Sequence, residues 1–237
     1  MLVHGFTQTS ASWDPLIADL AADHEVMTVD APNHGRSAGV DADLERGGAL
    51  IAEAGGPGTY IGYSMGGRFC LHTALAAPDT VRGVVLIGAT GGLDDDDDRA
   101  ARRLDDATRA SRIREIGVDR FLDEWLAQSL FAGLGEATQG REARRENTAE
   151  GLARSLELAG TGTQQPLWQR LSVMTAPALV PAGARDERFR VAGERLAAAI
   201  GNNATYATVP VAGHTAHLEQ PAGFLAVLRP WLRERGL

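Results

Sequence analysis

A serine between two glycines is the first feature of the chain with the residue types of a reactive site. Residues 62–66 read Gly-Tyr-Ser-Met-Gly, so Ser64 occupies a Gly-x-Ser-x-Gly pattern. This pattern is typical of the nucleophile elbow, a tight strand-to-helix turn that exposes a serine hydroxyl. An apolar segment (59–61) precedes it and a helix-like run (68–77) follows it, as the turn requires. Because glycine and serine also crowd ordinary turns, the pattern needs partners elsewhere in the chain.

Two further residues stand directly after predicted strands. Asp186 follows the apolar segment 177–183, and His214 follows the segment 205–210. The order serine, aspartate, histidine is that of the α/β-hydrolases. Since the carboxyl ends of parallel strands meet at one edge of a sheet, the three side chains are expected to lie together. We predict that His214 accepts the proton of Ser64 and that Asp186 orients the imidazole.

Backbone amides next to these residues could bind an oxyanion. Met65 directly follows the serine, and Phe6 lies in the loop His4-Gly5-Phe6 after the first apolar segment. We predict that the N–H groups of Phe6 and Met65 form an oxyanion hole. One such donor contributes roughly 100–1000-fold in rate.

Alternating apolar and helix-like segments must position these groups. Strands are expected near residues 1–3, 25–30, 59–61, 81–88, 177–183 and 205–210, and helices near 12–22, 44–54, 68–77, 191–200 and 224–233. The run 81–88 is apolar almost throughout, which is typical of a parallel strand covered on both faces. The alternation predicts an α/β fold with a mostly parallel sheet and helices on both faces.

The pattern changes between residues 94 and 165. The acidic run 94–98 is expected to be a solvated loop, because five adjacent aspartates cannot all turn toward one metal ion. From there to about residue 165 the chain is rich in Arg, Glu and Ala and has no strand-like run. We interpret residues 94–165 as a helical cap inserted into an α/β core formed by residues 1–93 and 166–237.

Composition excludes several classes of partner. The net charge is −8 and all 23 basic residues are arginine, which argues against nucleic acid or an anionic membrane surface. No apolar run is long enough to span a membrane and no signal peptide is recognisable. The single cysteine, Cys70, suits a reducing compartment and is expected to be a buried packing residue, so we predict a cytoplasmic protein. No cofactor or metal is predicted, and monomer and homodimer both stay open.

Several segments resemble the α/β-hydrolase superfamily. They are residues 4–6, 62–68, 183–189 and 213–221. More narrowly, the chain resembles the 2-succinyl-6-hydroxy-2,4-cyclohexadiene-1-carboxylate synthases of menaquinone biosynthesis, the MenH family. That choice depends on Arg68 after the elbow, on the cap segment 145–156, and above all on residues 160–168, Gly-Thr-Gly-Thr-Gln-Gln-Pro-Leu-Trp. The resemblance covers essentially the whole chain.

The resemblance implies a carbon–oxygen lyase that eliminates pyruvate from an enolpyruvyl-succinyl-hydroxycyclohexene-carboxylate. The triad would act as a base, without an acyl-enzyme, on a small-molecule polycarboxylate. By the same resemblance Arg68 and Arg145 would bind substrate carboxylates, and Tyr63 and Trp125 would form the pocket wall. A further cap arginine is expected, which would be one of Arg99, Arg102 and Arg103.

The chain departs from the family at two places. The family usually has one or two strands before the His-Gly loop, and this chain starts almost at that loop, so N-terminal edge strands are expected to be missing. Asn33 stands where glycine is usual, and asparagine tolerates a positive φ.

Two other functions stay open. A serine hydrolase, either a carboxylesterase or a carbon–carbon bond hydrolase, could use the same triad. A ligand-binding homologue without catalysis is the second alternative.

Overall fold

A six-stranded sheet forms the centre of the molecule, and the computed structural model describes all of residues 1–237. The strand order is β2-β1-β3-β4-β5-β6, and every neighbouring pair is parallel. The strands are β1 (Leu2–Val3), β2 (Thr28–Val29), β3 (Gly58–Tyr63), β4 (Val81–Ile87), β5 (Ala178–Gly183) and β6 (Ala204–Val209). The predicted α/β fold with a parallel sheet is confirmed. β2 forms one edge of the sheet and β6 the other.

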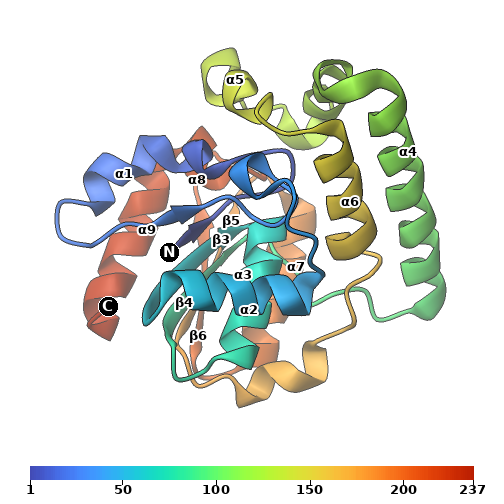
Figure 1. Cartoon of the computed structure of the whole chain (residues 1–237). Helices are drawn as coiled ribbons and strands as arrows, with labels where there is room; N and C mark the ends of the chain where they lie inside the picture. The colour runs from blue at the N-terminus through green and yellow to red at the C-terminus, as the bar shows by residue number, and fades with distance from the viewer.

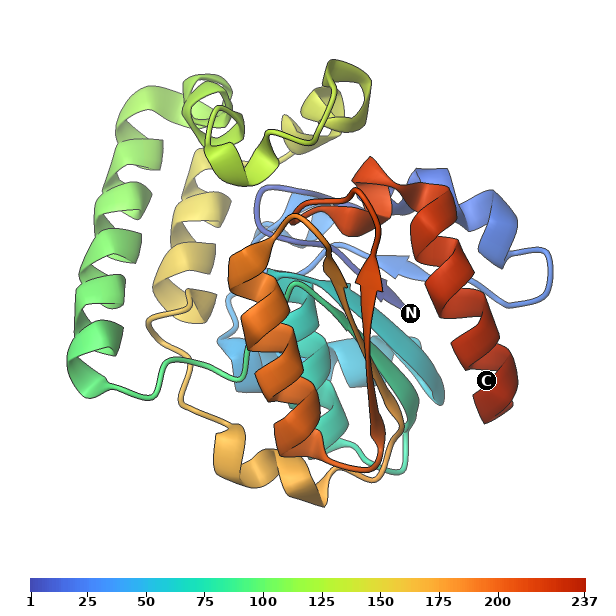
Figure 2. The same ribbon diagram turned by 180° about the vertical axis from the view of Figure 1, so that it is seen from behind.

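Helices cover both faces of the sheet (Figures 1 and 2). One face carries α2 (Leu44–Gly55), α3 (Met65–Ala76) and α7 (Glu187–Ile200), and the other carries α1 (Asp14–Leu20) and α9 (Pro221–Arg235). Successive residues of β4 alternate between the faces: Val84 and Leu86 join the first core, and Val85 and Ile87 join the second. Burial on both faces explains why this strand is apolar apart from the exposed Arg82 near its start.

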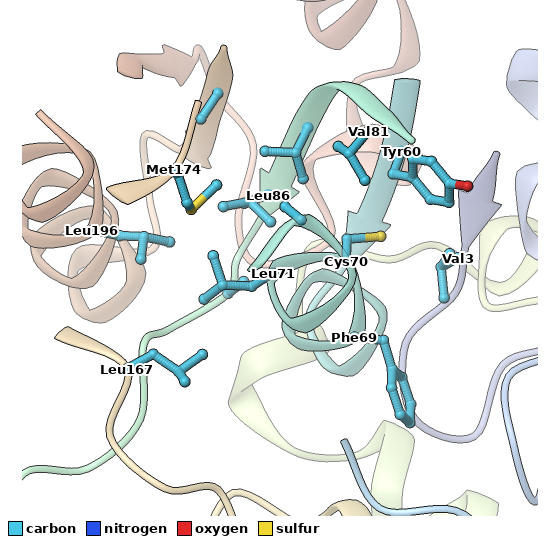
Figure 3. Packing of buried hydrophobic residues seen from close by; sticks show 14 of the residues in the cluster. Val3, Tyr60, Phe69, Cys70, Leu71, Val81, Leu86, Leu167, Met174 and Leu196 are labelled. Atoms are coloured by element: carbon cyan, nitrogen blue, oxygen red, sulfur yellow. The ribbon is translucent and has the colours of Figure 1, made fainter. Parts of the chain in front are cut away.

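Helix α3, which begins directly after Ser64, is the most enclosed helix of the core. Figure 3 shows Cys70 of this helix on the side of the sheet and Leu71 on the side of Leu196 of α7, whereas Phe69 points away from both. None of these three is exposed, and burial raises the pKa of the Cys70 thiol to about 12. A Cβ atom on Gly47 of α2 would lie 2.3 Å from the Phe69 ring, so glycine permits this close approach. The serine is therefore carried by a tightly packed helix.

The cap stands beside the sheet in both views (Figures 1 and 2). It contains α4 (Asp96–Leu126), η3 (Ser129–Phe131), η4 (Glu136–Thr138), α5 (Arg141–Arg144) and α6 (Ala149–Ala159). Ile113 of α4 and Leu152 of α6 belong to a small apolar core of the cap's own. Leu167 N–H donates to the Gly91 carbonyl at 2.8 Å, which brings the two ends of the insertion together.

The acidic run differs from its prediction as a solvated loop. Asp95 is the N-cap of α4, and its carboxylate accepts hydrogen bonds from Asp97 N–H at 2.9 Å and Asp98 N–H at 3.0 Å. The residues that follow form the first turn of the helix. Carboxylates stabilise the positive end of a helix dipole, so the run starts a helix.

Several short elements lie outside the predicted segments or, in the case of η1, at the edge of one. They are η1 (Ser10–Trp13), η2 (Gly35–Ser37), η5 (Trp168–Val173) and α8 (Ala216–Glu219). Asn33 has φ 66°, the left-handed conformation that its residue type was expected to tolerate. None of the helices combines the length and the apolar character needed to cross a bilayer.

Candidate active site

Ser64 occupies a strained turn between β3 and α3. Its φ is 52° and its ψ is −110°, outside the regions that ordinary residues favour. The flanking glycines have no room for a side chain: a Cβ on Gly62 would lie 2.3 Å from the Gly66 carbonyl oxygen, and one on Gly66 would lie 2.1 Å from that of Val3. The Gly-x-Ser-x-Gly spacing thus reflects contact between the turn and the neighbouring backbone.

His214 and Asp186 meet at the carboxyl edge of the sheet. The two side chains are 3% and 8% exposed, and His214 Nδ1 lies 2.8 Å from Asp186 Oδ2. A carboxylate only accepts hydrogen bonds, so Nδ1 carries the proton and Nε2 is left as the base. Asp186 is also the N-cap of α7, where it accepts from Phe189 N–H at 3.2 Å. His214 and Ser64 line the same cavity.

Glu219, which the sequence analysis did not single out for a role, holds the loop of His214 in place. Its carboxylate accepts hydrogen bonds from the N–H groups of Gly213 at 2.7 Å and Thr215 at 3.0 Å, on either side of the histidine. A glutamate five residues after a histidine gives no recognisable signal, because only the turn between them brings the groups together.

The two amides predicted for the oxyanion hole are free. Neither Phe6 N–H nor Met65 N–H donates a hydrogen bond within the protein. Met65 is the first residue of α3, where no intrahelical acceptor exists for its amide. Both residues line the cavity with Ser64. A Cβ on Gly5 would lie 2.6 Å from the Tyr63 ring, so the loop before Phe6 can approach β3 only with glycine there.

Two buried histidines support this loop. His4 Nε2 accepts from Ala31 N–H at 3.0 Å, and His34 Nε2 accepts from Thr7 N–H at 3.3 Å. Their Nδ1 atoms lie 2.8 Å from the Gly5 carbonyl oxygen and 3.0 Å from that of Pro32, respectively, so each Nδ1 carries the proton. Both rings must be neutral, because a protonated Nε2 could not accept. Burial lowers the pKa of His4 to about 4 and that of His34 to about 3.

Acidification is expected to destabilise the fold between about pH 6.5 and pH 4. An unfolded histidine has a pKa of about 6.5, so in this window the unfolded chain binds protons that the native state does not. The stability is fully present above pH 6.5 and is lost as the pH falls, by about 1.4 kcal/mol per pH unit for each such histidine. Urea unfolding near pH 7, 6 and 5 measures this slope.

His34→Gln supplies the control for the acid effect. Its amide oxygen can accept from Thr7 N–H and does not titrate. We therefore expect the unfolding free energy to fall less steeply with decreasing pH, by the contribution of one histidine. A wild-type unfolding free energy that is constant from pH 7 to pH 5 would contradict the prediction.

A cavity of about 650 Å³ lies between the core and the cap. Ser64 and His214 line it, and the side chains of Tyr63, Trp125 and Phe131 contribute apolar wall. Tyr63 and Trp125 therefore occur where the resemblance placed them. His217 is not among the residues that line the cavity. It is fully buried, and its ring centroid lies 4.7 Å from that of Tyr63.

Arg68 reaches the same cavity from α3. It is 7% exposed, and its guanidinium forms no hydrogen bond or ion pair within the protein. Burial lowers the pKa of Arg68 to about 10, so the group is charged at neutral pH. A buried cation without an acceptor is unfavourable, and a guanidinium matches the two oxygens of a carboxylate. This side chain is available to bind an anion beside Ser64.

The structure does not bring Arg145 to the cavity, which corrects its predicted role. Arg145 is exposed and forms ion pairs with Asp119 and Glu142 on the outer surface of the cap. The preceding residue, Arg144, is 2% exposed and lines the cavity. Adjacent residues of a helical turn point about 100° apart, so one residue of register decides which arginine faces inward. Burial lowers the pKa of Arg144 to about 10.

Of the three further cap arginines considered, only Arg102 lines the cavity. Its Nε donates to Asp106 at 2.8 Å. Arg99 instead donates to the carbonyls of Leu93 and Asp94, and Arg103 donates to that of Gly162. Arg109, which was not considered, also lines the cavity. The spacing of Arg102 and Arg109 would place both on one face of α4. Which face turns toward the cavity depends on how the insertion packs on the core.

The molecule combines a parallel sheet covered by helices, an inserted cap, and a serine elbow that shares a cavity with a histidine–aspartate pair, which are the features of an α/β-hydrolase. The pattern of the Alpha/beta hydrolase family matches residues 1–227, and the chain belongs to that family.

Among curated relatives, the chain is similar to 2-succinyl-6-hydroxy-2,4-cyclohexadiene-1-carboxylate synthases. It is 31% identical to that of Salmonella arizonae and 32% identical to that of Escherichia coli O1:K1, and each comparison covers 98% of this chain and 93% of the relative. The resemblance predicted from the sequence is confirmed.

Two solved structures have folds similar to that of this chain. MenH from S. aureus superposes with a TM-score of 0.91 and 26% identity, covering 100% of this chain and 93% of that one. A thermophilic esterase from Thermogutta terrifontis has a TM-score of 0.83 and 24% identity, covering 99% of this chain and 89% of that one, which shows the shared fold alone.

Proposed function

We propose that the protein is a carbon–oxygen lyase that forms 2-succinyl-6-hydroxy-2,4-cyclohexadiene-1-carboxylate by eliminating pyruvate from an enolpyruvyl-succinyl-hydroxycyclohexene-carboxylate. The observation that carries this proposal is the unpaired, buried Arg68 in the cavity of Ser64 and His214. A simple ester would leave this cation without a partner, whereas a substrate with several carboxylates provides one. The relatives named above support the same assignment.

Proton removal would begin the reaction. His214 Nε2 takes the proton of the Ser64 hydroxyl, and the serine oxygen takes a ring proton next to the succinyl ketone. Asp186 stabilises the imidazolium through the hydrogen bond at Nδ1. The electron pair of the broken C–H bond moves through the ring, and the C–O bond to the enolpyruvyl group breaks. The leaving enolpyruvate gains a proton and becomes pyruvate.

The negative charge that develops on the succinyl oxygen needs donors. The free N–H groups of Phe6 and Met65, which line the cavity, can supply two. No acyl-enzyme is formed, because the serine oxygen transfers a proton and does not attack a carbonyl.

Arginines would hold the carboxylates of the substrate. Arg68 and Arg144 are both buried and line the cavity, and Arg102 lies on its cap side. The net charge of −8 does not oppose this, because screening over about 8 Å makes nearby cations dominate. With one cysteine, fully buried, the protein suits the cytoplasm, which we propose as its location.

Pyruvate release tests the proposal directly. The substrate is made in situ by the preceding pathway enzyme, and pyruvate is followed by coupling to lactate dehydrogenase. We expect release well above the spontaneous elimination. If folded protein releases no pyruvate but turns over activated esters, the serine hydrolase is the correct function. Substrate binding with no turnover of either kind would instead identify a ligand-binding homologue.

A further inference from the structure

The turn that carries Phe6 contains a strained residue. Gln8 N–H donates to the Gly5 carbonyl at 3.1 Å, which closes a four-residue turn, and Thr7 at its third position has φ 67°. A type II turn usually has glycine there, and a positive φ is rare for a β-branched residue. Such conformations are strained and persist only where surrounding contacts hold them.

The contacts that hold Thr7 come mainly from the cap. Thr7 is fully buried, and its N–H donates to His34 of the core. Its carbonyl accepts from Asn147 Nδ2 at 2.8 Å, and its hydroxyl accepts from Arg144. If the cap stayed in place without these two donors, the carbonyl and the hydroxyl would be buried without a partner, and unsatisfied buried polar groups are costly.

Asn147 connects the cap with two loops of the core. It is 4% exposed, and its Nδ2 donates to the carbonyls of Thr7 and, at 2.9 Å, Arg144. Its Oδ1 accepts from Gly35 N–H at 2.9 Å in the turn after β2. Carbonyl partners on one side and an N–H on the other fix the orientation of the amide. An aspartate of the same shape could not donate to Thr7.

The side chain of Phe6 is anchored by the cap as well. Its ring lies edge-on to Trp125 at 5.2 Å and to Phe121 at 6.3 Å between centroids. Cap groups therefore hold Phe6 at its ring, and they hold the next residue, Thr7, at its carbonyl.

We propose that Asn147 is a positioning residue that aims the Phe6 N–H of the oxyanion hole by holding Thr7 in its left-handed conformation. The oxyanion hole is then complete only while the cap is seated on the core. This inference rests on the proposed function for its kinetic consequence, whereas its structural consequence is independent of the reaction. If Thr7 relaxed to a negative φ, the peptides of the turn would rotate and Phe6 N–H would leave its position.

Asn147→Asp and Asn147→Ala test the positioning role. A small misplacement of a catalytic group costs about 100-fold, and the donor acts on charge that appears only in the transition state. We therefore expect kcat for pyruvate release to fall at least about 30-fold, with KM within about threefold of wild type. In hydrogen exchange without substrate, amides of residues 6–8 are expected to exchange faster, and those of β3 and β4 to stay unchanged.

Thr148→Ala is the matched control. Thr148 is an exposed neighbour that caps the N-terminus of α6 by accepting from Gly151 N–H at 2.9 Å, so the substitution destabilises the start of this helix without touching Thr7. Its kcat is expected to stay within threefold of wild type.

The outcomes separate the two proposals. Wild-type kcat in Asn147→Asp, or an equal kcat loss in Thr148→Ala, overturns the positioning role. Unchanged exchange at residues 6–8 overturns it too. Absence of pyruvate release by wild type overturns the proposed function, and hydrogen exchange then still decides whether Asn147 holds the turn.

Discussion

Replacing Ser64 by alanine is expected to lower kcat for pyruvate release by about a thousandfold and to leave the fold intact. Positioned acid–base groups contribute typically 100- to 10,000-fold, and the serine oxygen is the atom proposed to remove the ring proton. Alanine fits the elbow, because the tight contacts of this turn fall on Gly62 and Gly66. The coupled pyruvate assay measures the loss, and thermal unfolding measures the stability.

Ser172→Ala serves as the control for this substitution. Ser172 is exposed and lies in η5, outside the cavity, so its replacement is expected to change neither rate nor stability. If Ser64→Ala kept more than about a tenth of the wild-type rate, the serine would not be the proton carrier. His214 would then have to act on the substrate directly.

Replacing Arg68 by methionine is expected to reduce activity and to stabilise the free protein at the same time. Loss of a charge-assisted contact to a substrate carboxylate should lower kcat/KM by about 100-fold or more. In the free enzyme, the same guanidinium is buried without an acceptor, which costs about 1–3 kcal/mol. Methionine has a similar length and no charge, so thermal unfolding should shift to a temperature higher by several degrees.

Arg145→Met provides a comparison on the same assays. Arg145 is 43% exposed and paired only with surface carboxylates, and such pairs contribute about 0–1 kcal/mol. We expect activity within about twofold of wild type and a small loss of stability. An Arg68→Met variant that is less stable than wild type and still fully active would refute the anion-binding role.

The residues predicted as the triad, and the sheet that positions them, could be found from the sequence alone. The glycines around Ser64, the order of Asp186 and His214, and the apolar run in β4 follow from local rules. A tight turn needs glycine, catalytic residues follow the ends of strands, and a strand covered on both faces must be apolar. Each of these requirements acts within a few residues of the chain, so it leaves a readable pattern.

The cap was readable as helical but not as a binding surface. Arg144 and Arg145 are equivalent as residue types, and only the seating of α5 on the core decides that Arg144 is enclosed while Arg145 meets surface carboxylates. The acidic run is a second example. Its residues are compatible with a loop, and they form a helix N-terminus because α4 follows them.

The contacts proposed to hold the oxyanion hole come from the packing of the cap on the core. The left-handed Thr7 has no local cause, since threonine disfavours that conformation. Its partners, Asn147 and Arg144, lie 140 and 137 residues away along the chain. Short-range patterns report the requirements of turns, helices and strands, whereas contacts between separate elements depend on how those elements pack. For this reason the predicted triad could be found from the sequence, whereas the residues proposed to position the Phe6 N–H could not.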